Sequence, residues 1–273
     1  MLIWGLTFIA TKIALREFPP FQLSVARLAL AWLVLYPFAR REGLRLRSML
    51  QPELLWLGLT GVALFYGFET IGMQYTSAAS GSLFQAALPC LTAFFSFLFL
   101  KEKLSRMQFA GIALSILGVI LITLTGALHL EGDSLLGSLL VLVSLLSWVA
   151  YTILGKRMTL RYSSLVITTA TMGAGLLFLL PFGGIELAVV GAPHPTLAGW
   201  SAFLFLSLGG SAAAYYFWNH ALQFMDANTA SPFINLIPVV GLIAALLWGE
   251  PVSIFQLAGG ALAIAGVWLS SIK

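Results

Sequence analysis

Residues 81–118 read GSLFQAALPCLTAFFSFLFLKEKLSRMQFAGIALSILG, and residues 230–266 read ASPFINLIPVVGLIAALLWGEPVSIFQLAGGALAIAG. Each stretch is an apolar run with a proline near its middle, followed by a polar break and a second apolar run rich in small residues. The corresponding residues are Pro89 and Pro238, Glu102 and Glu250, Gln108 and Gln256, Gly111 and Gly259, and Gly118 and Gly266. A pattern that occurs twice indicates an internal repeat, which decides the fold class.

The composition is that of a membrane protein. Of the 273 residues, 60% are hydrophobic and 9% are charged, too few charges to cover the surface of a soluble domain. The single cysteine, Cys90, lies inside an apolar run, where it reads as a small buried hydrophobe, and it offers neither a disulfide framework nor a metal-ligand cluster. We therefore expect an all-α integral membrane protein without metal or cofactor.

We expect ten transmembrane helices. Most of the apolar runs are close to the ~20 residues that a ~30 Å hydrocarbon layer requires. The first run is short and starts at Met1, but it has no basic region and no cleavage site, so it is interpreted as a span and not as a signal peptide. The expected spans are 1–15, 20–39, 53–72, 78–99, 105–125, 134–155, 163–183, 197–219, 228–248 and 252–271.

The basic residues predict the orientation. Eleven of the 14 lysines and arginines fall in the segments after spans two, four and six or at the C-terminus, which leaves Lys12, Arg16 and Arg27. The positive-inside rule then places both termini in the cytoplasm and the chain in the cytoplasmic membrane. The net charge of +4 is thus a topology signal, aided by contact with membrane lipid, and nucleic acid is not an expected partner.

The repeat extends over the chain. Residues 66–89 align with residues 215–238, and residues 4–12 resemble residues 148–156. Each half, 1–126 and 132–273, holds five expected spans. Because five is odd, the second half enters the membrane from the opposite side. The prediction is two inverted five-helix repeats, an architecture typical of secondary transporters, with the substrate site near the bilayer midplane.

Several motifs resemble the EamA-type members of the drug/metabolite transporter superfamily. They are Trp4-Gly5-Leu6-Thr7-Phe8 with Lys12, Pro19-Pro20 before Arg27-Leu28, the Pro89 helix ending in Lys101-Glu102-Lys103-Leu104, and the helix of Gly111 and Gly118. The second half is similar at Pro238, Glu250 and Gly259, but Thr171 stands where the first half has Arg27. The resemblance implies a ten-helix exporter of amino acids or similar metabolites that does not hydrolyse ATP.

Enzyme signatures are absent from the sequence. It contains no P-loop, no His-Glu-x-x-His zinc helix and no Gly-x-Ser-x-Gly elbow, and its three histidines are far apart. We therefore predict that the chain is not an enzyme.

Charged residues inside spans are the first candidates for a substrate site, because charge in hydrocarbon is costly. Lys12, Arg27 and Glu69 all fall in the outer part of the first half. Lys12 or Arg27 could contact an anion or carboxylate, with Glu69 as counter-ion or proton carrier. The alternative is that the cations snorkel and one ion pair is structural.

Polar and aromatic residues complete the candidate substrate site, with interfacial anchoring as the alternative for the tryptophans. Gln85 and Asn235 each precede a mid-span proline, Pro89 or Pro238, which would act as a hinge and free a carbonyl one turn earlier. The alternative is a plain kink whose amide bonds a neighbouring helix. The remaining candidates are Trp4, Tyr66, Trp148, Tyr151, Tyr215, Trp218 and Asn219.

Other features are interpreted as scaffold. Small residues at Gly111 and Ser115, and at Gly259 and Ala263, permit close helix contact, either within one protomer or between two, so the chain is a monomer or a homodimer. Glu102 and Glu250 are expected to be structural ion pairs or caps.

The sequence thus favours an exporter of amino acids or related small molecules that works by alternating access, with spans one, three, four, six, eight and nine lining the cavity. One rival is an exchanger of phosphorylated or nucleotide-linked sugars, which needs a basic cluster that only Lys12, Arg27 and Lys156 could supply. The other is a membrane scaffold that does not transport.

Overall fold

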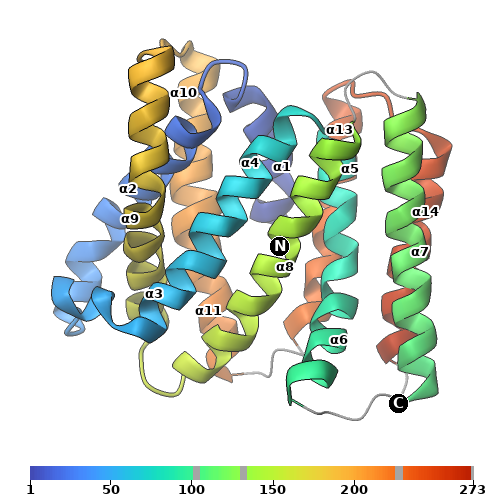
Figure 1. Ribbon diagram of the computed structural model, residues 1–273, viewed down its shortest axis with the longest axis horizontal. Helices are drawn as coiled ribbons and strands as arrows, with labels where there is room; N and C mark the ends of the chain where they lie inside the picture. The colour runs from blue at the N-terminus through green and yellow to red at the C-terminus, as the bar shows by residue number, and fades with distance from the viewer. Residues whose placement is uncertain (101–104, 130–133, 225–229, 272–273) are drawn as a thin grey trace. The chain divides into compact units, whose positions relative to one another are not determined.

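The computed structural model describes residues 1–100, 105–129, 134–224 and 230–271, and Glu102 lies outside them. In these residues the chain is helical and contains no strand (Figure 1). Six helical segments are long and apolar enough to cross a membrane, namely Pro20–Arg41, Pro52–Gln74, Ala78–Phe95, Leu135–Met158, Ser164–Val190 and Leu197–Phe224. Four shorter apolar helices are Leu2–Ala14, Arg106–Ile122, Phe233–Leu247 and Ile254–Ser270. All ten lie where the sequence predicts a span, and the number of crossings remains a prediction.

The helices form two compact units. Unit 1 comprises Met1–Ile9, Gly72–Val149 and Asn228–Lys273, and unit 2 comprises Ala10–Ile71 and Ala150–Ala227. Each unit therefore takes helices from both predicted repeats. We describe each unit by itself.

Unit 2 is built on two long antiparallel helices. These are α2 (Pro20–Arg41) and α9 (Ser164–Val190), which pack along each other. The amide of Gln22, at the start of α2, donates to Glu186 at the end of α9 over 2.8 Å. At the opposite end, the hydroxyl of Ser163 before α9 donates to Glu42 after α2. A carboxylate near a helix N-terminus compensates the unpaired N–H groups of that helix. A carboxylate at the end of each helix therefore stabilises the start of the other.

Helix α9 is longer than the sequence predicts. The expected span stopped at residue 183, but the helix continues to Val190. Residues 185–190 contain neither glycine nor proline, and the helix ends where Gly191 takes a positive φ of 87°. Glu186 in this stretch has the partner of its carboxylate on α2.

The rest of unit 2 consists of two interrupted helices and the second part of α8 (Leu135–Met158). In one, α3 (Pro52–Gly58) passes through a π-helical stretch, η2 (Leu59–Leu64), into α4 (Phe65–Gln74). In the other, α10 (Leu197–Leu204) passes through a longer π-helical stretch, η4 (Phe205–Ala213), into α11 (Ala214–Phe224). A short 3₁₀ turn, η1 (Leu46–Leu50), links α2 to α3, and α1 (Leu2–Ala14) is shared between the units.

Unit 1 contains the two stretches with which the sequence analysis began. The first forms α5 (Ala78–Phe84), a 3₁₀ turn η3 (Gln85–Ala87), α6 (Leu88–Leu100) and, beyond the polar break, α7 (Arg106–His129). The second forms a 3₁₀ turn η5 (Ser231–Asn235), α13 (Leu236–Leu247) and α14 (Ile254–Ser271). The carboxylate of Glu250 accepts from the amides of Ala78 and Ala79 over 3.2 and 3.1 Å, so the prediction that Glu250 is a structural cap is confirmed.

Helices α7 and α14 lie side by side within one chain (Figure 1). A Cβ placed on Gly259 would meet the carbonyl oxygen of Gly118 at 2.7 Å, and one on Gly266 would meet that of Gly111 at 2.5 Å. The backbones therefore touch without side chains between them, as the small residues predicted.

Candidate functional site

The centre of unit 2 holds a buried arginine. Arg27 lies on α2 with 2% of its surface exposed. Its Nε donates to the hydroxyl of Ser211 over 3.0 Å, and one terminal nitrogen donates to the carbonyl of Leu206 over 3.3 Å and to the hydroxyl of Tyr66 over 3.4 Å. Its guanidinium carbon also lies 4.3 Å from the centre of the Tyr66 ring, a cation–π distance. The guanidinium is thus enclosed by the unit.

The acceptors for Arg27 come from a π-helical stretch. Leu206 and Ser211 both belong to η4. A π-helical turn shifts its backbone hydrogen bonds from i→i+4 to i→i+5, and such turns occur frequently at functional sites. The stretch also contains Gly209 and Gly210.

A chain of aromatic and amide groups extends from the arginine. The ring of Tyr66 lies 6.1 Å from that of Tyr215, which lies 5.9 Å from that of Tyr151. The hydroxyl of Tyr151 donates to the amide oxygen of Asn219 over 2.9 Å, and the amide nitrogen of Asn219 donates to Thr168 over 2.9 Å. Five of the predicted residues thus form one buried cluster with Arg27 at one end and Asn219 at the other.

Gly61, in η2, makes this arrangement possible. The hydroxyl of Tyr215 donates to the Gly61 carbonyl over 2.7 Å. A Cβ at Gly61 would lie 2.5 Å from Cγ of Tyr151 and 2.8 Å from its Cε2. Both π-helical stretches therefore contribute directly to the cluster, η2 through a carbonyl and η4 through a carbonyl and a hydroxyl.

Three further predicted residues lie in unit 2. Glu69 is buried on α4 one turn beyond Tyr66, and Trp218 is buried on α11 one turn beyond Tyr215. Lys12 lies half-buried on α1. Within the described residues, Arg27 forms no ion pair with a carboxylate. Lys156, which the sugar-phosphate alternative requires, donates to the Leu222 carbonyl over 3.0 Å near the end of α11.

The other four predicted residues lie in unit 1. Trp4 and Trp148 contact each other edge to face, with ring centres 5.2 Å apart, and Trp148 is buried. Trp56, Trp200 and Trp268, in contrast to Trp148, are exposed. The remaining two residues of unit 1, Gln85 and Asn235, belong to the 3₁₀ turns η3 and η5.

The prolines interrupt their helices as predicted, but the expected free carbonyls find partners. Each 3₁₀ turn ends shortly before its proline, Pro89 or Pro238. The carbonyl of Gln85 accepts from the amide of Leu88, and that of Ile234 accepts from the amide of Leu236. At Gln85 a 3₁₀ bond, which joins residues three apart, takes the place of the bond that Pro89 removes. The amide of Leu236 makes its 3₁₀ bond to the carbonyl of Phe233 and also contacts that of Ile234. Each carbonyl thus has one partner within the chain, and its contact with substrate stays a prediction.

Four residues of the cluster were missed by the sequence analysis, namely Gly61, Thr168, Leu206 and Ser211. Their signal was weak, since Gly61 and the Gly209-Gly210-Ser211 run are small residues in apolar spans. Among the described residues, no group of three or more histidines, cysteines or acidic residues could hold a metal ion. The cluster brings together a guanidinium, hydroxyls, an amide and aromatic rings, the chemical groups that recognise a polar ligand.

Comparison with known proteins identifies the kind of protein that shares this fold. The profile of the EamA-like transporter family matches residues 1–124 and again residues 135–272. An uncharacterized transporter of Archaeoglobus fulgidus is 31% identical, over 100% of this chain and 95% of its own length. A crystal structure with 20% sequence identity superimposes with a TM-score of 0.72, covering 99% of this chain and 94% of that chain, and shows the fold.

Two further relatives have names that mention a substrate. A probable terminal-alkyne amino-acid exporter of Streptantibioticus cattleyicolor is 29% identical, covering 97% of this chain and 89% of its own length. A probable amino-acid metabolite efflux pump of Salmonella typhimurium is 28% identical, covering 99% and 91%.

Proposed function

Since the chain belongs to the EamA-like transporter family, we propose that this multi-pass membrane transporter exports amino acids or similar small metabolites from the cytoplasm. The observation that carries the proposal is the buried Arg27, which forms no ion pair within the described residues and lies against neutral acceptors and an aromatic ring. The names of two relatives point to the same substrate class.

A carboxylate is the chemical group that this arginine suits best. A guanidinium has five N–H donors in a planar fork, and the three contacts of Arg27 use Nε and only one of its terminal nitrogens. A buried guanidinium is stabilised by a directly paired carboxylate, and a bound substrate carboxylate supplies such a pair through short, charge-assisted bonds. The tyrosine rings next to it suit an ammonium group or an apolar side chain.

Glu69 is the proposed counter-ion or proton carrier. It is the buried carboxyl one turn from Tyr66, on the helix that contributes to the arginine site. Lys12 and Trp218 are proposed to border the same site. In unit 1, Trp4, Gln85, Trp148 and Asn235 are proposed to take part in substrate passage, with Pro89 and Pro238 as bending points.

We further propose ten crossings in two inverted repeats, 1–126 and 132–273, with both termini in the cytoplasm. Three pairs of related features support the repeat. The two π-helical stretches interrupt equivalent spans, the two prolines each follow a 3₁₀ turn, and Gly111 and Gly118 meet Gly266 and Gly259 in reciprocal fashion.

Export by proteoliposomes tests the function. Purified protein is reconstituted and assayed with a panel of radiolabelled amino acids, with sugar phosphates and nucleotide sugars as the competing substrate class. Arg27→Leu should abolish measurable export, because losing a charge-assisted hydrogen bond of about 1.5–3 kcal/mol weakens binding roughly ten- to hundredfold. Arg27→Lys keeps the charge but not the planar fork, so it should retain part of the activity at a higher KM.

The matched control is Arg16→Leu, which removes an arginine that is exposed at the end of α1. It should export normally. Full export by Arg27→Leu would refute the carboxylate site, and export of sugar phosphates alone would refute the substrate class. Absence of any transport across the panel would favour the scaffold alternative.

A further inference from the structure

One end of unit 2 carries a concentration of exposed arginines, which we call the arginine rim. They come from the end of α2, the linker to α3, the end of α8 and the loop before α9. They are Arg40, Arg41, Arg45, Arg47, Arg157 and Arg161. Two acidic side chains lie among them, and one of these, Glu42, already accepts the hydroxyl of Ser163. The rim is therefore strongly positive.

Apolar side chains are exposed beside these arginines. In η1, Leu46 and Leu50 are 56% and 57% exposed. Leu46 lies between Arg45 and Arg47 in the sequence, and Leu50 follows Arg47 by three residues. Leu160, next to Arg161, is 85% exposed. The guanidinium of Arg41 lies 6.0 Å from the ring centre of Phe38, which is itself exposed. Arginines alternating with exposed aliphatic and aromatic groups are typical of a segment at a membrane surface.

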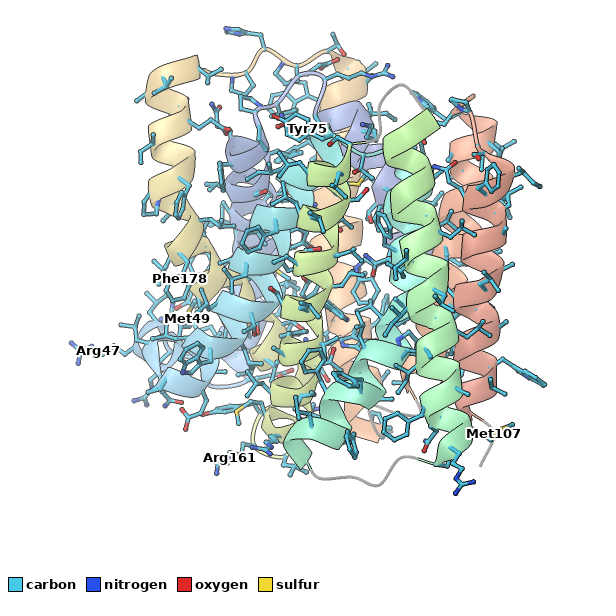
Figure 2. The ribbon with its side chains drawn as sticks, turned by 45° about the vertical axis from the view of Figure 1, so that its right-hand side comes forward. Arg47, Met49, Tyr75, Met107, Arg161 and Phe178 are labelled. Carbon is cyan, nitrogen blue, oxygen red and sulfur yellow. The ribbon has the colours of Figure 1, made fainter. Side chains whose placement is uncertain are left out.

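The linker is fixed in this position by one buried residue. Met49 is 4% exposed, and its methyl group fills the space that Gly173 of α9 leaves open, beside Trp32. Figure 2 shows Met49 directed into the unit, whereas Arg47 and Arg161 point away from it. Met49 therefore anchors η1, while Leu46 and Leu50 of the same turn remain exposed.

A hollow lies within the rim. Its volume is about 250 Å³, and its lining includes Gly43, Ser48, Arg161 and Tyr162. Glu42 also lines it, with its carboxylate bonded to the hydroxyl of Ser163. Gly43 has a positive φ of 94°, and no atom lies within 4 Å of its Cβ position. At about 30 Å³ per water molecule, the hollow accommodates several waters, which is enough space for a phosphate group.

We propose that the arginine rim binds an anionic phospholipid, with its phosphate at the hollow beside Arg161 and its acyl chains along Leu46 and Leu50. The charge selects an anionic headgroup over a zwitterionic one. The exposed leucines select a lipid over a soluble phosphate, which would leave them in water. This proposal is independent of the transported substrate.

Native mass spectrometry of the detergent-purified chain tests the proposal. The protein is titrated with phosphatidylglycerol and, separately, with phosphatidylcholine of the same acyl chains. The wild type should bind the first phosphatidylglycerol at least tenfold more tightly. Arg45→Gln with Arg161→Gln should weaken that binding about 25-fold, because one basic side chain near an anionic surface is worth about fivefold in affinity.

The matched control combines Arg16→Gln with Arg106→Gln, two exposed arginines outside the rim. It removes the same charge and should change phosphatidylglycerol binding less than twofold. Leu46→Ser with Leu50→Ser tests the acyl contact and should weaken the binding of both lipids, while glycerophosphoglycerol, which has no acyl chains, should not compete. Equal affinity for both lipids, or an equal loss in the control pair, would overturn the proposal.

Discussion

Replacing Gly61 by alanine should disrupt the buried cluster. The new Cβ would lie 2.5 Å from Cγ of Tyr151 and 2.8 Å from its Cε2, against an optimum of about 3.5–4.0 Å between carbon atoms. The ring must therefore move by about 1 Å. It is fully buried and packs against Tyr215, so no free space receives it.

The free-energy change has three parts. Overpacking costs about 1–3 kcal/mol. Movement of the ring breaks the 2.9 Å bond from Tyr151 to Asn219 and leaves a buried hydroxyl unpaired, which costs about 1–3 kcal/mol more. Alanine gains about 0.5–1 kcal/mol over glycine within a helix. The expected destabilisation is roughly 1.5–5 kcal/mol, with loss of substrate binding because the cluster is displaced.

Thermal unfolding in detergent, followed by tryptophan fluorescence, measures the stability. The Tm should fall by at least about 3 °C. Gly184→Ala is the matched control, because Gly184 lies in α9 and no atom is within 4 Å of its Cβ position, so its Tm should stay the same or rise slightly. Adding Tyr151→Leu to Gly61→Ala should recover stability but not export. An unchanged Tm and normal export in Gly61→Ala would refute the described packing.

Two other predictions concern bending and topology. Pro89→Ala and Pro238→Ala remove the ring and supply a backbone N–H, which lets each 3₁₀ turn become continuous α-helix. Each should therefore raise thermal stability and slow turnover more than it weakens substrate binding. Because the halves are proposed to be inverted, the two should shift the labelling of a cavity cysteine in opposite directions, and equal shifts would contradict the hinges. In a Cys90→Ala background, a cysteine at Ala192 should react with an impermeant thiol reagent added outside, whereas one at Gly43 should not. The reverse labelling would contradict cytoplasmic termini.

Most helix positions could be predicted because local residues, such as a proline at the start or charged residues at the end, determine where a helix begins and ends. The helix α2 begins at Pro20 and ends after Arg40 and Arg41, close to the predicted 20–39. The extension of α9 to Val190 could not be predicted, because composition alone does not say that the Glu186 carboxylate meets the amide of Gln22, which is distant in sequence.

The candidate site was predicted in part for similar reasons. Arg27 stands out because a charge within an apolar run is rare. Its acceptors on η4 could not be predicted, because a π-helical turn depends on packing and the Leu206 carbonyl has no sequence signal. The division of the twelve candidates between two units also depends on contacts between distant segments. The bond of the Gln85 carbonyl could not be predicted for a local reason, because a 3₁₀ turn replaces the bond that Pro89 removes.

The contact between α7 and α14 has a consequence for mutational tolerance. At Gly259 and Gly266 even a methyl group would meet a backbone carbonyl of the facing helix, and a backbone atom cannot change rotamer to make room. In a saturation mutagenesis library, these positions should accept no other residue. Leu117, next to Gly118 on α7, is 57% exposed and should accept any apolar residue. Along the two helices, the glycine positions at the contact should therefore tolerate no substitution, whereas the exposed positions beside them should tolerate exchange among apolar residues.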